Sequence, residues 1–235
     1  METITRIGII GAMEDEVSAI RQQMNITDTQ TIASMEFCCG TLKGKEAVVV
    51  QCGMGKVNAG ICAQMLISVF GVNAVVNTGV AGSLNNDINI GDIVISTDAV
   101  QHDFDVSAIG FAKGEIPYTG LYAFEADKTL RAKAAEAVKA VSPDTGIFEG
   151  RVCSGDQFIA SKEQKKRIIE QFNGYCAEME GAAIAQVCHL NHIPFVIIRA
   201  ISDKADDSEE VSFEIFAKKA AAISASAVIH MADNL

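Results

Sequence analysis

The sequence predicts an α/β protein built around a sheet with buried parallel strands. Short runs of aliphatic and β-branched residues, such as Val196–Ile198, have the continuous apolar character of strands covered on both faces. They alternate along the chain with longer segments of helical period. Polar residues, here Arg199, Ser202 and Asp203, stand where such a run should end. Because ligands of open α/β sheets bind at the carboxyl ends of the strands, we expect the binding site there.

The composition favours a single cytoplasmic domain that comprises residues 1–235. The formal net charge of −11 argues against nucleic acids and anionic membranes as partners, because both are bound through Lys and Arg. The seven cysteines form no CxxC pair and are odd in number, which suits free thiols in a reducing compartment. No signal peptide is visible, and no apolar run approaches the roughly 20 residues that a membrane span needs.

The first half of the chain is predicted to hold strands, one hairpin and two helices. A buried strand at 6–12 leads into a helix that starts at Glu14, where acidic residues suit the positive end of the helix dipole. Residues 31–51 alternate as a hairpin does. A helix from 56 to about 70 and a strand at 74–78 follow, and Gly79–Gly82 should open a loop.

The second half continues this alternation to the C-terminus. We expect strands at 93–96, at 150–154 and from 196 to about 198, where Arg199 and the polar residues after it should end the strand, and helices at 126–140, at 161–172 and from about 177 to 189. Ser161 should cap the second of these helices, and the acidic run 206–210 should form a solvated loop. Ser212 should cap the last helix, whose inward side chains are expected to be Phe213, Phe216 and Ala217.

Helical periodicity separates acids that point inward from acids that point to water. Glu16 shares a face with the apolar residues of its helix, whereas Glu14 lies on the polar face. Glu180 lies on the apolar face of its helix, and Glu178, about 160° away, is expected to point outward. A plainer explanation stays open for these residues, since acids at helix starts interact with the dipole and Asp203 could cap the next turn.

Three inward acids at strand ends, Glu16, Glu180 and Asp203, suit the hydrolysis of a glycosidic bond. One carboxylate acts as base on water while another, held protonated by its surroundings, donates to the leaving group. Negative charge stabilises the oxocarbenium-like transition state between them. The sequence therefore favours an N- or O-glycosidic hydrolase over a Ser-His-Asp enzyme, of which no order of residues stands out.

Two further motifs give weaker signals. The glycine spacing of Gly53–Lys56 matches neither a P-loop nor a dinucleotide-binding loop, and a tight turn or a close approach to a ligand explains it better. His102, Asp103 and Asp105 match known metal-ligand spacings poorly and are expected to form a loop or a subunit contact. We therefore expect neither a cofactor nor a metal.

Five motifs in register resemble the bacterial 5′-methylthioadenosine/S-adenosylhomocysteine nucleosidases. They are Gly8–Glu16, Asn77–Gly79, Ser154–Ile159, Glu178–Glu180 and Arg199–Asp203. The resemblance implies a three-layer α/β/α fold of the nucleoside phosphorylase type with a central mixed sheet. It also implies a homodimer that hydrolyses 5′-methylthioadenosine, S-adenosylhomocysteine and 5′-deoxyadenosine to adenine and the sugar, in methionine salvage.

By the same resemblance, five residues are catalytic. Asp203 would protonate purine N7 with help from Ser202, Glu16 would activate the water with Arg199 beside it, and Glu180 would bind the ribose hydroxyls and stabilise the cationic sugar. Substrate-binding residues would line the purine, ribose and 5′-thioether parts of the site: Met13, Met54, Gly82, Phe158, Ile159, Met179 and Phe213. A loop that covers the partner's site in that family would correspond to the segment Val106–Pro117, with Ile109 within it.

Val80 departs from the resemblance, because a small polar residue is expected there, so we assign its side chain no polar role. A phosphorylase of the same fold is the first rival, but it needs cationic surroundings for phosphate, whereas an inward Glu16 would repel that anion. A nucleoside-binding module without catalysis is the second rival, and it would have little use for an acid and a base on opposite sides of a sugar.

Overall fold

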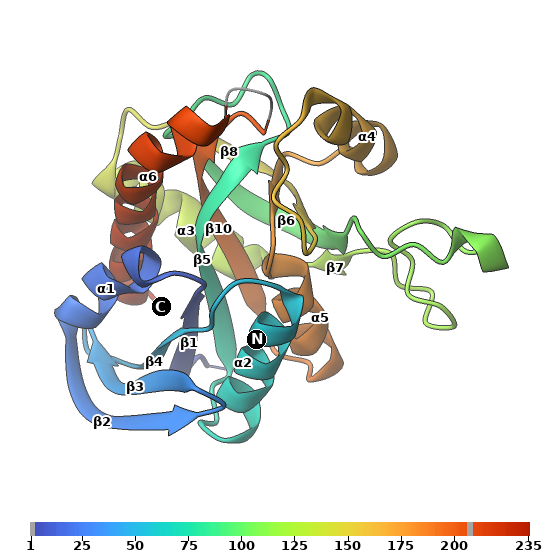
Figure 1. Ribbon diagram of the computed structural model, residues 1–235. Helices are drawn as coiled ribbons and strands as arrows, with labels where there is room; N and C mark the ends of the chain where they lie inside the picture. Colours follow the sequence, from blue (N-terminus) through green and yellow to red (C-terminus); the bar gives the residue numbers. More distant parts are fainter. Residues whose placement is uncertain (1–2, 206–208) are drawn as a thin grey trace.

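The structure is a computed structural model that describes residues 3–205 and 209–235, with the side chains of the last helix described from Phe216 onward. Within these residues ten strands form one mixed sheet (Figure 1). The strands are β1 (Arg6–Gly11), β2 (Met24–Ile32), β3 (Met35–Leu42), β4 (Lys45–Gln51), β5 (Ala74–Ser83), β6 (Ile93–Gln101), β7 (Phe124–Glu125), β8 (Ile147–Ser154), β9 (Cys176–Glu178) and β10 (Phe195–Asp203).

The sheet is parallel at its centre and antiparallel at one edge. Strand β1 pairs in parallel with β4 and β5, and β10 pairs in parallel with β5. Strands β2, β3 and β4 form an antiparallel meander. Because β10 also pairs with β6, and β9 pairs with both β5 and β8, five strands close into a ring: β5, β10, β6, β8 and β9. This ring brings the carboxyl ends of β5 and β10 beside β9.

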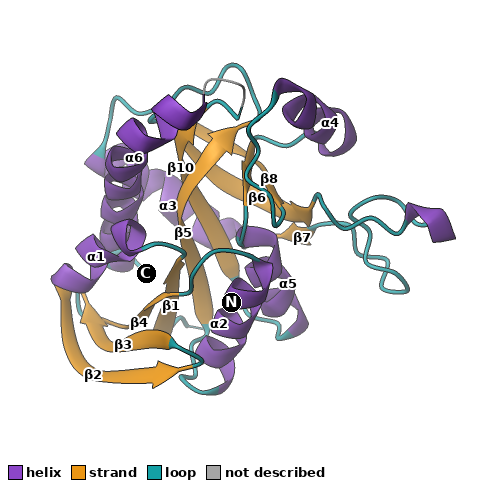
Figure 2. Cartoon of the chain, in the orientation of Figure 1, coloured by secondary structure: helices purple, strands orange, loops and turns teal. Residues whose placement is uncertain are grey.

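Helices cover both faces of the sheet (Figure 2). Helices α1 (Glu14–Gln23), α3 (Lys128–Val141) and α6 (Glu209–Ala232) pack on one face, and α2 (Lys56–Ser68) and α5 (Gly181–Leu190) pack on the other. Helix α4 (Lys162–Phe172) follows β8 and begins at Ser161, whose hydroxyl accepts the Gln164 N–H as predicted. The mixed sheet between two helical layers confirms the predicted fold class.

Strand β5 is longer than the sequence indicated. Gly79–Gly82 were predicted to form a loop, but they continue the strand and pair with β10 as far as Gly82. The prediction was wrong because glycine was taken as a sign of a turn, whereas here it leaves room for side chains that pack against the strand. Strands β2 and β9 were not predicted either, because β2 is exposed and polar and β9 has three residues.

The start of the last helix also differs from the prediction. Helix α6 begins at Glu209, so Glu209 and Glu210 are helical and Ser212 is not the cap. Residues 206–208 of the predicted solvated loop lie outside the described residues. Phe216, expected to face inward, is 37% exposed.

A long segment between β6 and β7, residues 104–121, projects from the body of the molecule (Figure 1). We call it the arm. It contains the 3-10 turn Ser107–Ile109, and its apolar side chains Ile109 and Tyr118 are 67% and 92% exposed. Exposed apolar side chains that lie together are typical of surfaces that contact another molecule.

All seven cysteines are free thiols, and six of them are buried. In the described part of the chain, no helix is both long and apolar enough to cross a membrane.

Candidate active site

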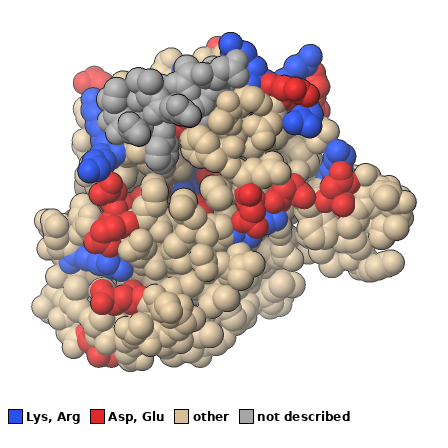
Figure 3. All heavy atoms as spheres, in the orientation of Figure 1, with Lys and Arg blue, Asp and Glu red and all other residues tan. Residues whose placement is uncertain are grey.

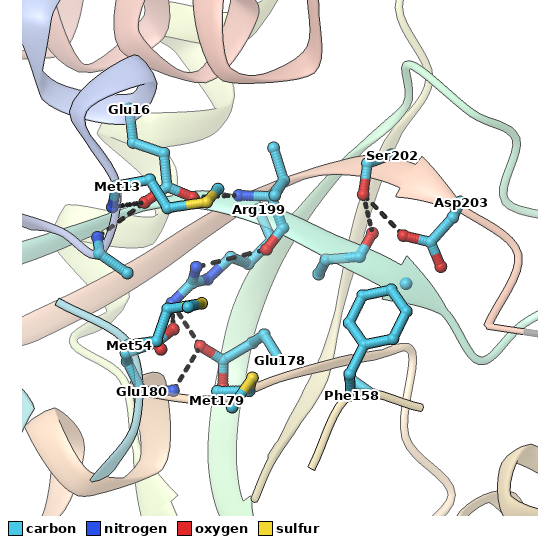
Figure 4. Close-up of a pocket in the computed structure, with 15 residues that line it drawn as sticks. Met13, Glu16, Met54, Phe158, Glu178, Met179, Glu180, Arg199, Ser202 and Asp203 are labelled. Atoms are coloured by element: carbon cyan, nitrogen blue, oxygen red, sulfur yellow. Dashed lines mark hydrogen bonds and ion pairs between the residues drawn. The ribbon is translucent and has the colours of Figure 1, made fainter. Parts of the chain in front are cut away.

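A cavity lies at the carboxyl ends of the central strands (Figure 4). Carboxylates, methionines and an aromatic ring line it together, as in many small-molecule sites. Ten of the predicted site residues line it: Met13, Glu16, Met54, Gly82, Phe158, Met179, Glu180, Arg199, Ser202 and Asp203. Val80, the position that departs from the resemblance, lines it too. The three predicted acids therefore meet in one place although they come from three different segments of the chain.

Glu16 is held at one end of the cavity by backbone amides. Its Oε2 accepts the N–H groups of Ala12 and Met13 at 2.7 and 3.0 Å, and its Oε1 accepts the Val80 N–H at 3.0 Å. The side chain is fully buried. Burial raises the pKa of Glu16, and the opposing effects of Arg199 and of the three amides do not cancel it. The carboxylate is thus fixed in place and has a raised proton affinity.

Arg199 is the buried cation of the site. It lies on β10 and is 1% exposed. Its guanidinium forms an ion pair with Glu178, donates to Asn77 Oδ1 at 2.5 Å and to the Val80 carbonyl at 3.3 Å, and stands 3.6 Å from Glu180 Oε2. A buried guanidinium needs such partners, because an unpaired charge in the interior costs several kcal/mol.

Glu178 is a site residue that the sequence interpretation placed wrongly. It was predicted to point outward from a helix, but it ends strand β9, where its carboxylate is buried. It accepts hydrogen bonds from the Ser154 hydroxyl and from the Gly181 N–H at 2.8 Å, besides its ion pair with Arg199. The helix begins only at Gly181, so the 160° separation from Glu180 does not apply. The signal for a strand was the buried run Cys176–Ala177 before it.

Glu180 lies at the N-cap of α5 and points into the cavity, as predicted. Its Oε1 accepts the Gly55 N–H at 2.9 Å. Burial and the neighbouring Glu178 charge raise the pKa of Glu180 to about 7, although Arg199 acts in the opposite direction. Near neutral pH this carboxyl is therefore present in both its protonated and its ionised form.

Asp203 lies at the other end of the cavity from Glu16 (Figure 4). It is 2% exposed. Its Oδ2 accepts the Ser202 hydroxyl at 2.7 Å and its Oδ1 accepts the Ala205 N–H at 2.9 Å. Phe158, half exposed, lies on the same side of the cavity and can stack on a flat ligand next to Asp203. The arrangement places one carboxyl beside a planar aromatic group and a second carboxyl at the far end of the cavity.

Two glycines of β5 make room for these carboxylates. A Cβ at Gly79 would lie 2.5 Å from both Arg199 Nη1 and Glu16 Oε1, and a Cβ at Gly82 would lie 2.6 Å from Asp203 Oδ1. Val80 between them contributes through its backbone N–H and carbonyl, as noted above. These backbone contacts agree with the expectation that the Val80 side chain has no polar role.

Several predicted binding residues are not brought to the cavity. Ile159 is buried in a separate cluster beneath α4. Val106, Ile109 and Pro117 lie on the arm, away from the site (Figure 1). The side chain of Phe213 lies outside the described residues.

Comparison with known proteins places these features in a family. A family model described as the phosphorylase superfamily matches residues 6–232. The 5′-methylthioadenosine/S-adenosylhomocysteine nucleosidase of Shewanella loihica is 44% identical over 98% of this chain and all of its own length. The enzyme of that name from Staphylococcus aureus strain bovine RF122 is 40% identical over 97% of this chain and all of its own length.

Solved structures show the same likeness. A Neisseria meningitidis nucleosidase of the same name, in complex with methylthio-immucillin-A, superposes with a TM-score of 0.95 at 38% identity, covering 99% of this chain and all of that one. Futalosine hydrolase of Helicobacter pylori has a TM-score of 0.92 at 36% identity, covering 99% of each chain.

The close packing at Gly79 predicts a stability effect. Gly79→Ala should lower the free energy of unfolding by roughly 1–3 kcal/mol, because the added methyl group forces apart Glu16 and Arg199. Gly60→Ala is the matched control, since its Cβ would meet nothing closer than Val187 at 3.9 Å within helix α2. That variant should gain roughly 0.5–1 kcal/mol. Urea unfolding measures both, and a Gly79→Ala protein as stable as the wild type would contradict the packing argument.

The raised pKa of Glu180 predicts a pH-dependent stability. The native carboxyl keeps its proton up to about pH 7, whereas in the unfolded chain it loses the proton near its usual pKa of 4.5. The native state therefore binds more protons between these values, and the contribution of Glu180 to stability declines as pH rises through this window. The free energy of unfolding of the wild type, taken relative to Glu180→Gln, should fall by about 3 kcal/mol across the window. Parallel curves for the two proteins would show that the pKa is not raised.

Proposed function

The chain belongs to the 5′-methylthioadenosine/S-adenosylhomocysteine nucleosidase family within the phosphorylase superfamily, and we propose which of its residues carry out that family's reaction. It is a nucleosidase that hydrolyses the N-ribosidic bond of 5′-methylthioadenosine and S-adenosylhomocysteine, releasing adenine and the 5′-alkylthioribose. The observation that carries the assignment of roles is the placement of Asp203 and Glu16 at opposite ends of one cavity that Glu180 and Arg199 also line.

Asp203 is the general acid in this proposal. Adenine leaves poorly as an anion, so a proton delivered to N7 lowers the barrier, and a positioned acid contributes about 10²–10⁴-fold in rate. The Ser202 hydroxyl and the Ala205 N–H each hold one carboxyl oxygen, so the acid has one orientation toward the purine. Phe158 stacks on the purine face and keeps N7 within reach.

Glu16 is the general base that takes a proton from the attacking water. Three backbone amides fix both of its oxygens, and its raised pKa makes it a better base near neutral pH. Arg199 lies beside it and is held by Glu178, which we add to the site as the residue that positions the guanidinium.

The middle of the cavity suits a ribosyl cation. The Glu180 carboxylate accepts hydrogen bonds from the ribose hydroxyls, and Met179 packs on the sugar. Glu16, Glu178 and Glu180 surround one Arg199, so the site carries excess negative charge wherever all three carboxyls are ionised. That charge stabilises an oxocarbenium-like transition state.

The 5′ side of the substrate meets soft apolar walls. Met13 and Met54 line the cavity there, and a thioether packs well against such polarisable groups. We propose that this pocket also accepts 5′-deoxyadenosine, which lacks the thioether.

The arm, with Val106, Ile109 and Pro117, reaches the site of a partner subunit in a homodimer, and its exposed apolar tip supports this arrangement. The side chain of Ile159 points away from the cavity, so only its backbone, next to Phe158, is proposed to contact the purine edge. Phe213 is proposed to line the 5′ side, and the whole chain acts as one cytoplasmic nucleosidase domain.

The contacts of Glu16 favour water over phosphate as nucleophile. The amides of Ala12, Met13 and Val80, which could bind an anion, are already occupied by the Glu16 carboxylate. The nearest guanidinium, that of Arg199, is paired with Glu178. A phosphate ion would meet a fixed negative charge at this position.

Adenine release in phosphate-free buffer tests the reaction. With 5′-methylthioadenosine and S-adenosylhomocysteine in parallel, we expect adenine and the free alkylthioribose from both. Release that begins only after phosphate is added would indicate a phosphorylase and remove Glu16 from the role of base. Binding of both compounds without any release would indicate a binding module.

Asp203→Asn removes the proposed acid while keeping the shape of the side chain. We expect kcat to fall by about 10²–10⁴-fold with KM within a few-fold of the wild type, because the lost interaction acts in the transition state. Initial rates of adenine release measure both constants. A kcat within threefold of the wild type would exclude Asp203 as the acid.

Glu16→Gln removes the proposed base. The expected result is a similar loss of about 10²–10⁴-fold in kcat, with 5′-methylthioadenosine still bound as measured by calorimetry. Glu14→Gln, two residues earlier on the outer face of α1, is the matched control and should keep full activity. An active Glu16→Gln variant would mean that another group activates the water.

A further inference from the structure

Three segments meet beside the cavity: the start of α2, the end of β6 where the arm begins, and the loop after β8 that carries Phe158. Lys56 Nζ donates to Asp103 Oδ1 at 2.6 Å, and Asp103 Oδ2 accepts the Asp156 N–H at 2.9 Å. Asp156 Oδ1 in turn accepts the Lys56 N–H at 2.8 Å. Each residue thus contacts the other two, and we call Lys56, Asp103 and Asp156 the polar triangle.

Asp156 is exposed, but the ion pair of Lys56 and Asp103 is shielded from water more than a surface ion pair is. The side chains of Lys56 and Asp103 are 18% and 17% exposed. Lys56 Nζ also donates to Gln101 Oε1 at 3.0 Å. Burial acts to raise the pKa of Asp103, but the hydrogen bonds from Lys56 and Asp156 hold it below its usual value. In Figure 3 acidic and basic side chains lie together where the arm joins the body. These contacts therefore hold the start of α2, the end of β6 and the loop after β8 in one arrangement.

The polar triangle connects the two halves of the proposed substrate site. Gly55 and Lys56 present consecutive amides at the start of α2. The Gly55 N–H donates to Glu180, the proposed ribose ligand, and the Lys56 N–H donates to Asp156, two residues before Phe158, the proposed purine platform. One backbone turn thus sets the distance between the ribose ligand and the purine platform.

The packing around Gly155 adds a second restraint on the same loop. The His102 ring lies where a Cβ of Gly155 would stand, and the His102 N–H donates to the Ser154 carbonyl at 2.9 Å. His102, two residues before the arm, therefore packs directly against Gly155, the first residue of the loop that carries Phe158.

We propose that Lys56, Asp103 and Asp156 are positioning residues that fix the Phe158 loop relative to Glu180. None of the three lines the cavity, so they act through the residues they hold. The proposal rests on the function assigned above to Phe158 and Glu180. Because a purine platform contacts the base in both the ground state and the transition state, loosening it weakens binding more than it slows the chemical step.

Lys56→Met removes the ion pair and keeps the length and much of the apolar stem of the side chain. We expect KM for 5′-methylthioadenosine and Kd for adenine to rise about tenfold each, with kcat changed less than about threefold. Lys56→Arg restores a cation with donors and should bring both constants back to within about threefold of the wild type. Combining Lys56→Met with Asp103→Asn should raise KM no further than about twofold beyond the worse single variant, because both break one unit.

The control is an ion pair of similar exposure outside the triangle. Arg151 Nε and Asp98 Oδ1 are 2.6 Å apart, with side chains 25% and 20% exposed. Arg151→Met should lower the melting temperature at least as much as Lys56→Met does, yet leave KM and Kd for adenine unchanged. A merely structural role for Lys56 would give the result expected for Arg151→Met.

Phe158→Ala separates failure of this inference from failure of the proposed function. If Phe158→Ala raises KM and Lys56→Met, folded by circular dichroism, does not, the positioning role is wrong and the function of Phe158 stands. If Phe158→Ala leaves KM and Kd for adenine unchanged, both the purine platform and the polar triangle's role are overturned. A rise of KM in Lys56→Met with recovery in Lys56→Arg supports the inference.

Discussion

The buried Arg199 guanidinium is the interaction on which the rest of the site depends. A cation that is 1% exposed must be surrounded by acceptors, and the fold supplies them from Glu178, Asn77 and the Val80 carbonyl. Glu16 and Glu180 add their charges nearby. One positive charge among three carboxyls does not neutralise the cluster. Burial, and after it the Glu178 charge, therefore raise the pKa of Glu180 to about 7. The same excess charge suits a cationic sugar and disfavours a phosphate nucleophile.

Strand β5 carries glycine where this cluster of side chains packs against it. Its backbone passes so close to Glu16, Arg199 and Asp203 that positions 79 and 82 accommodate only glycine without displacement of a neighbour. The strand in return offers the Val80 N–H to Glu16. Glu16, the proposed base, and Asp203, the proposed acid, are thus both placed against one strand, and the length of β5 between its two glycines sets their separation. Rigid placement on strands holds a catalytic group more closely than placement on a loop does.

Much of this could be predicted from the sequence, and the failures have physical causes. Apolar runs and helical period located most elements, and inward-facing positions identified Glu16 and Glu180. Glu178 was placed on the wrong side because a three-residue strand has too short a pattern to show its period of two, so the helical period was applied to it. The glycines of β5 were interpreted as a loop because a close approach by distant side chains leaves no trace in the local sequence. The polar triangle, formed by residues 56, 103 and 156, depends on contacts between distant segments and was not predictable.

Asp203, the proposed acid, and Glu16, the proposed base, should face the substrate from opposite ends of the cavity. A crystal structure of the Glu16→Gln variant with intact 5′-methylthioadenosine would test this arrangement. We expect purine N7 within about 2.6–3.2 Å of an Asp203 carboxyl oxygen, and the face of C1′ away from the purine turned toward residue 16. A purine bound at the residue 16 end, or N7 beyond hydrogen-bond distance of Asp203 with another group beside it, would show that the proposed roles are wrong.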